Sequence, residues 1–176
     1  MKRLIRIGLI LMLLAGFNGV NGQALTVGMT APELRVGGWL KGTPITKLDT
    51  GKIYVVEFWA TWCMPCRAMI PHLTELQEKY KDKVIIIGVS VWEKNPDYIP
   101  VFVESMGDKM NYHVAKDDLS RVDTPSGYMA VNWLTAAGAP GIPWAFIIDK
   151  SGKIAFAGNS ADIDAPLEKI LQNKNL

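Results

Sequence analysis

Cys63 and Cys66 are the only cysteines in the 176-residue chain, and two residues separate them in the segment FWATWCMPC. A disulfide between them would close a very small loop, so it would remove little entropy from the unfolded chain and stabilise the fold only modestly. A zinc site needs four ligands, and the pair supplies two. The only histidines are His72, on the same predicted helix, and His113, in a distant predicted strand. The spacing therefore favours redox chemistry over a structural bridge or a metal site.

The cysteine pair lies where a β-favouring run, KIYVVEFWA (52–60), gives way to helical periodicity over residues 63–80. Cys63 would begin that helix, where free backbone N–H groups and the helix dipole favour negative charge. This position lowers the pKa of a thiol from about 8.5 and makes it a nucleophile. Cys66 follows one turn later, close enough to attack a mixed disulfide on Cys63. The pattern indicates thiol–disulfide exchange.

Strand and helix patterns alternate along the rest of the chain, and they predict an α/β fold with a central mixed sheet. A composition of 49% hydrophobic and 20% charged residues agrees with one packed domain. Residues 25–50 predict a β-hairpin or loose strands. The later elements are a strand at 83–92, a helix at 95–106, a short strand at 111–118, a short helix at 127–138, two strands within 144–158 and an amphipathic helix at 162–174.

Residues 1–24 have the layout of a secretory signal peptide. Three basic residues precede the apolar run at 7–17, and small and polar residues follow it. The run is short for a membrane span, which needs about 20 residues, although an uncleaved anchor is the alternative. Cleavage after Gly22 or Ala24 would leave a domain over residues 25–176. We therefore expect an exported protein, located in the periplasm or cell envelope.

The charge of the chain without this leader gives no sign of a nucleic-acid partner, because 16 basic and 17 acidic residues leave a net charge of −1. No haem-binding CxxCH motif is present. We expect a monomer without a metal or a cofactor.

The segment VVEFWATWCMPC (55–66) resembles the active site of thioredoxins, and above all that of exported TlpA/ResA-like thiol-disulfide oxidoreductases. Pro71 matches the proline inside the family's active-site helix, GIPWAFIID (141–149) resembles its cis-proline segment, and DKSGKIAFAG (149–158) matches its final hairpin. The resemblance covers residues 27–171. It implies a thioredoxin fold with an N-terminal β extension and a short helical insertion, within 112–138, before the cis-proline segment.

Glu57 is a carboxylate inside an otherwise apolar strand, so burial should raise its pKa unless it is paired. The alternative is a glutamate at the sheet rim, paired with a lysine. The resemblance implies that Glu57 is catalytic together with Cys63 and Cys66, by exchanging a proton with Cys66. Two positions depart from the family: Gly88 lies where thioredoxins carry a lysine partner for the acid, and Met69 lies where some ResA-like proteins carry a glutamate.

The resemblance also implies a substrate-binding surface. Pro143 would follow a cis bond, and the backbone of Ile142 would pair with an extended substrate. Trp62 and Trp144 flank the two motifs and could form an apolar rim for docking.

The leading hypothesis is an exported thiol-disulfide oxidoreductase that reduces disulfides in envelope proteins, apocytochrome c being one candidate, with a membrane protein as thiol-electron donor. The CMPC motif lacks the histidine that would make the pair more oxidising. One alternative is a peroxiredoxin-like peroxidase, although Ala60 and Val56 occupy the positions where that family has threonine or serine and proline. The other is a binding or chaperone module that uses the same groove without turnover.

Overall fold

The computed structural model describes residues 24–120 and 126–173. The predicted leader lies outside these residues, apart from Ala24. Within the described ranges, no helix is both long enough and apolar enough to cross a membrane.

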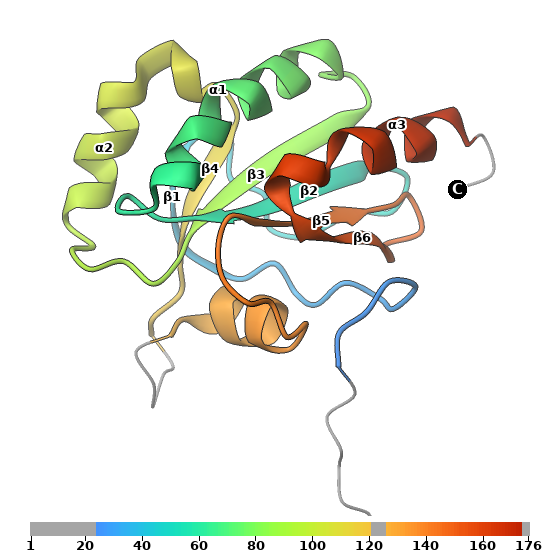
Figure 1. Cartoon of the computed structure of the whole chain (residues 1–176), viewed down its shortest axis with the longest axis horizontal. Helices are drawn as coiled ribbons and strands as arrows, with labels where there is room; N and C mark the ends of the chain where they lie inside the picture. Colours follow the sequence, from blue (N-terminus) through green and yellow to red (C-terminus); the bar gives the residue numbers. More distant parts are fainter. Residues whose placement is uncertain (1–23, 121–125, 174–176) are drawn as a thin grey trace, which may run out of the picture.

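A six-stranded mixed sheet forms the centre of the molecule, with the strand order β1-β4-β3-β2-β5-β6 (Figure 1). The predicted α/β architecture is confirmed. The strands are β1 (Val36–Lys41), β2 (Ile53–Trp59), β3 (Val84–Ser90), β4 (His113–Asp117), β5 (Trp144–Ile148) and β6 (Ile154–Asn159).

The central strand β2 pairs in parallel with β3 and antiparallel with β5. All seven of its residues are buried, which explains why its sequence is a continuous apolar run interrupted only by Glu57. β5 and β6 form the expected antiparallel hairpin. The mixed sheet and the final hairpin that we expected are therefore both present.

The N-terminal segment forms loose strands rather than a β-hairpin, the two arrangements that we expected for residues 25–50. It contributes the single strand β1, which pairs antiparallel with β4, a strand more than 70 residues further along the chain. The residues before β1 bond elsewhere: Leu25 N–H donates to the carbonyl of Ala136, and Thr30 bridges to Lys153. Gly37 permits the close pairing, because a Cβ there would lie 2.6 Å from the Asp117 carbonyl oxygen.

Helices cover the two faces of the sheet unequally (Figure 1). On one face, α1 (Met64–Lys79), α2 (Tyr98–Met106) and α3 (Asp164–Gln172) pack with the buried residues of β2 and β3. On the other face lie the N-terminal segment and the predicted insertion, whose helix is a π-helical turn, η2 (Ala130–Thr135). α2 begins at Tyr98, three residues later than expected, because Asn95 and Pro96 accept the bonds of a preceding turn.

The insertion is attached to the sheet by a buried carboxylate. Asp117, at the end of β4, accepts the backbone N–H groups of Met129 (2.7 Å) and Ala130 (3.0 Å) at the start of the helical turn. These bonds satisfy donors that have no partner inside the turn itself.

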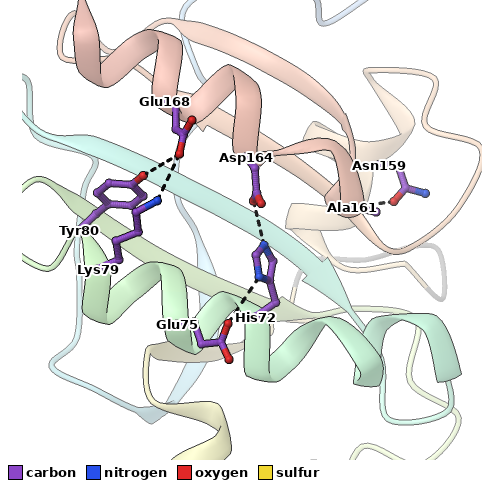
Figure 2. Close-up of polar contacts among 8 residues, drawn as sticks. All are labelled: His72, Glu75, Lys79, Tyr80, Asn159, Ala161, Asp164 and Glu168. Carbon is purple, nitrogen blue, oxygen red and sulfur yellow. Dashed lines mark hydrogen bonds and ion pairs between the residues drawn. The ribbon is translucent and has the colours of Figure 1, made fainter.

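Polar contacts join α1 to α3 on the outer side of the sheet (Figure 2). The His72 ring lies 2.8 Å from the Asp164 carboxylate, and Lys79 and Tyr80 both donate to Glu168. His72 is thus a surface contact residue. Because these groups are exposed, each pair adds little stability, and their effect is to fix the position of α1 relative to α3.

Candidate active site

Cys63 and Cys66 form a disulfide at the N-terminus of α1, with their Cα atoms 5.3 Å apart. Cys63 is the N-cap residue and Cys66 lies in the first turn. Both residues are buried, with Cys63 4% exposed and Cys66 1% exposed. Within the described part of the chain, no cluster of three or more His, Cys, Asp or Glu residues could hold a metal ion.

The helix N-terminus is arranged to stabilise negative charge on Cys63. The backbone N–H of Cys66 points at the Sγ of Cys63 from 3.3 Å, and no acidic residue lies in the first turn. In the reduced protein, this N–H and the helix dipole would favour the thiolate form of Cys63. Arg67 adds a positive charge nearby, although its guanidinium is turned toward the ring of Phe102.

The loop before β5 lies against the same sulfur. The Ile142–Pro143 bond is cis, as the resemblance implied, and Pro143 is buried. The carbonyl oxygen of Ile142 lies 3.8 Å from the Sγ of Cys63. An extended substrate that paired with the Ile142 backbone would therefore bring its own disulfide to Cys63.

The loop that follows β3 supports the segment before the cysteines, a feature that the sequence analysis missed. The Glu93 carboxylate accepts the backbone N–H of Thr61 (2.7 Å) and its hydroxyl (2.6 Å), and it also accepts the hydroxyl of Ser90. A glutamate in a polar loop carries no sequence signal that separates this role from an exposed one. These bonds fix the approach of the chain to Cys63.

The two tryptophans of the predicted rim lie in different environments. Trp62 is 42% exposed, and its indole N–H donates to the carbonyl of Trp92 (2.9 Å), a residue with a positive φ of 51°. The ammonium of Lys94 lies 5.3 Å from the Trp62 ring. Trp144 is half-buried and packs with the core on the opposite face of the sheet from the cysteines. The structure therefore brings Trp62 to the site more directly than Trp144.

Glu57 is buried, with 1% exposure, on the same face of β2 as the residues that pack against Cys63 and Cys66. Its Oε1 accepts the Ser160 hydroxyl at 3.3 Å. Burial raises the pKa of this carboxyl to about 8, and the bond from Ser160 lowers it only in part. No lysine pairs with Glu57 among the residues that the structure describes, so the alternative of a paired rim glutamate is wrong. Ser160 comes two residues after the final hairpin motif, and no sequence pattern indicated that its hydroxyl would reach Glu57.

A redox-active cysteine pair that begins a helix and faces a cis-proline loop, on a mixed sheet of this order, defines a protein of the thioredoxin fold. Residues 45–108 match the family model described as Thioredoxin. The thioredoxin domain of a thiol-disulfide oxidoreductase from Bacteroides vulgatus superimposes with a TM-score of 0.64 at 25% identity, over 83% of this chain and 98% of that one.

Two curated relatives cover most of the chain. It is 31% identical to the thiol:disulfide interchange protein HelX of Rhodobacter capsulatus, over 82% of this chain and 80% of HelX. It is 33% identical to a DsbE homolog, a thiol:disulfide interchange protein of Paracoccus denitrificans, over 80% of this chain and 76% of that protein. The chain belongs to the thioredoxin superfamily, among the ResA- and HelX-like thiol-disulfide oxidoreductases, and it is a disulfide oxidoreductase.

We predict that Cys63 has the lower thiol pKa, by at least about one unit below the free value of about 8.5, because it caps the helix. The measurement is the rate of iodoacetamide alkylation against pH in the single variants Cys66→Ser and Cys63→Ser. Cys66, which is buried one turn inside the helix, is expected to react only at higher pH. Faster alkylation of Cys66 near neutral pH would contradict this assignment.

We also predict that Glu57 makes stability depend on pH. Its pKa rises from 4.5 in the unfolded chain to about 8 in the folded one, so the folded state holds an extra proton between these values. Unfolding free energy should therefore fall as pH rises from about 4.5 to about 8, by an amount on the order of 4 kcal/mol. Urea unfolding of the oxidised protein across this range tests the prediction. Glu57→Gln should remove this component of the slope, and an identical slope in the variant would show that Glu57 is not the group responsible.

Proposed function

We propose that the protein is an exported reductase that transfers electrons from the Cys63–Cys66 dithiol to disulfides of other exported proteins. The observation that carries the proposal is the position of the Cys63 sulfur, between the N–H of Cys66 and the carbonyl of Ile142. The first contact favours a thiolate. The second provides backbone at which a substrate strand can pair.

The exchange takes place in two displacements. The Cys63 thiolate attacks one sulfur of the substrate disulfide, which forms a mixed disulfide and releases the other substrate sulfur as a thiolate. The Cys66 thiolate then attacks the Cys63 sulfur, closes the Cys63–Cys66 disulfide and releases the second substrate thiolate. The protein loses two electrons and the substrate gains them.

Glu57 is proposed to carry the proton of the second displacement. Cys66 attacks only as a thiolate, so its proton must leave, and a nearby carboxylate can accept it. With a pKa of about 8, the carboxyl of Glu57 exchanges protons near neutral pH, which an ordinary glutamate with a pKa of 4.5 would do poorly. In the opposite direction of exchange, the protonated carboxyl would return the proton to Cys66.

The direction of exchange rests on the residues between the cysteines. Met64 and Pro65 carry no positive charge, whereas a histidine at either position would stabilise the thiolate and make the disulfide more oxidising. We therefore infer a pair that is stable as a disulfide and acts as a reductant when it is supplied with electrons. A membrane protein that transfers thiol electrons would supply them.

The place of action and the substrates follow from the leader and from the relatives. Residues 1–24 are proposed to direct export to the periplasm or cell envelope, which leaves a domain over residues 25–176 that acts as a monomer. The relatives are named as thiol:disulfide interchange proteins. Exported proteins with disulfides, apocytochrome c among them, are the proposed substrates.

Substrate binding is assigned to the surface around Cys63 and the loop before β5. The backbone of Ile142 is proposed to pair with the substrate strand, and Pro143 to form an apolar wall beside it. Trp62 is proposed to contact apolar substrate side chains, since its indole is exposed and held in place by the carbonyl of Trp92. Trp144 would act from behind the loop, by supporting Ile142 and Pro143.

The protein, supplied with dithiothreitol, is predicted to reduce insulin at a rate that depends on both cysteines. Cys63→Ser should lower the catalysed rate by at least about 100-fold, because exchange needs a thiolate at the helix start. Turbidity of the released insulin B chain gives the rate, with the double cysteine variant as the background. A rate equal to that background would contradict turnover and favour a binding module.

Partners can be captured in the cell. Cys66→Ser should accumulate mixed disulfides with exported proteins, because the second displacement is blocked. The measurement is mass spectrometry of adducts isolated from the cell envelope, in which reduction with dithiothreitol must release the partner. Cys63→Ser is the matched control and should trap few or none. Equal adducts in both variants, or adducts made only of cytoplasmic proteins, would contradict the proposal.

A further inference from the structure

On the sheet face that packs against the cysteines, three buried polar atoms have no hydrogen-bond partner among the described residues. They are Oε2 of Glu57, the indole Nε1 of Trp59 and the hydroxyl oxygen of Tyr112. Buried polar groups in folded proteins nearly always have a partner, either protein or water. A group of three such atoms beside an active site therefore calls for a shared explanation.

Gly88 connects these groups in space. In the parallel register of β2 and β3, Gly88 lies opposite Glu57. A Cβ on Gly88 would lie 2.9 Å from Cε2 of Tyr112 and 3.3 Å from Nε1 of Trp59. Because Gly88 has no side chain, the Tyr112 ring and the Trp59 indole fill the space beside it, and this space adjoins the strand position of Glu57.

The three groups are chemically complementary. The Trp59 N–H only donates, the Tyr112 hydroxyl donates and accepts, and an ionised Oε2 only accepts. A single water that accepted bonds from Trp59 and Tyr112 and donated one to Oε2 would satisfy all three atoms. Such a water would keep one hydrogen for a further acceptor.

No charged side chain is among the groups that act on the Glu57 carboxyl, so hydrogen bonds to its Oε2 must come from neutral groups. Besides burial, the described neighbour that acts on its carboxyl is Ser160, through a hydrogen bond. The charge of Glu57 in turn acts on Tyr112, whose phenol pKa is raised first by burial and then by Glu57. The cysteines at the start of α1 are the other buried titratable groups of this core and are bonded to each other, and Tyr80 packs against the same core while only partly buried. No lysine or arginine in the described chain contributes to the state of Glu57.

We propose that Tyr112 is a positioning residue for Glu57: its hydroxyl, with the indole N–H of Trp59, holds a buried water against Oε2 and so sets the pH at which this carboxyl releases its proton. This proposal rests on the proposed role of Glu57 in thiol–disulfide exchange, and it adds Tyr112 as the residue that adjusts the pKa of Glu57. Tyr112 does not touch the substrate or the reacting sulfurs. It acts through Glu57 alone.

The test uses the full oxidised protein and the infrared C=O band of the protonated Glu57 carboxyl, identified by its loss in Glu57→Gln. Tyr112→Phe removes one oxygen and keeps the ring. Because the charged carboxylate loses hydrogen-bond support, the midpoint of the band's titration should rise by about 0.5 to 1 pH unit. In the reduced protein, resolution of a mixed disulfide at pH 7 should slow by about 3- to 10-fold, since less carboxylate is present.

Tyr54→Phe is the matched control. Tyr54 lies on the same strand as Glu57 and is equally buried, but its side chain packs with the opposite core, where its hydroxyl accepts the Asp49 N–H at 3.2 Å. This variant loses a buried hydroxyl and should leave the midpoint unchanged. If Tyr112→Phe fails to fold, Gly88→Ala displaces the same ring, because its Cβ would come within 2.9 Å of Cε2, and the same upward shift is expected.

A midpoint in Tyr112→Phe within about 0.2 unit of the wild-type value would overturn the proposal, because a lost hydrogen bond to a charged group must change its titration. An equal shift in Tyr54→Phe would overturn it as well, since the effect would then come from general loosening of the core. The titration needs no turnover. A shifted midpoint in a protein that cannot reduce insulin would support the pairing with Tyr112 and contradict only the proposed function.

Discussion

Strand β2 is bonded to β3 on one side and to β5 on the other, and both of its faces are buried. A strand held in this way has one register, because a shift by one residue would exchange the two faces of the core. Its end at Trp59 therefore fixes where the chain leaves the sheet and where α1 begins five residues later, at Met64. The position of Cys63 at the helix N-terminus follows from that constraint.

The loops next to β3 and β5 place the other residues of the site at the end of the sheet where Cys63 lies. β3 is followed by the loop in which Glu93 holds Thr61 and the Trp92 carbonyl holds Trp62. β5 is preceded by Ile142, whose carbonyl faces the Cys63 sulfur. Three adjacent strands thus supply the cysteines, the supporting loop and the proposed substrate-pairing backbone. This arrangement keeps reactive groups on loops while a rigid sheet positions them.

Glu57 conflicts with the strand that carries it. A carboxyl in a fully buried strand is unfavourable when charged, and its pKa of about 8 shows that the fold holds it as the acid over most of the neutral range. A Val or Ile at this position would suit the core better. Local choices that oppose stability are expected at functional sites, and this one lies on the face of β2 that packs against the cysteines.

Much of the fold and the placement of the cysteine pair could be predicted from the sequence, because these features depend on local patterns. The continuous run of β2, the helix after Cys63 and the hairpin of β5 and β6 each have a periodicity or a turn of their own. The pairing of β1 with β4 could not be predicted, since its partner lies far along the chain and the Gly-rich segment suits many arrangements. The contributions of Tyr112, Ser160 and Glu93 were also hidden, because each depends on which polar atom tertiary packing brings near it.

If the Cys63–Cys66 pair gives electrons to other disulfides, its equilibrium reduction potential at pH 7 must be low, and measuring this potential is the decisive test. The purified protein is equilibrated with mixtures of reduced and oxidised dithiothreitol or glutathione. The free thiols are then alkylated, and the reduced fraction is measured by mass spectrometry. We expect a potential below about −200 mV, toward the value of about −270 mV for thioredoxin. A value near −120 mV, which is typical of a strong oxidant, would contradict it.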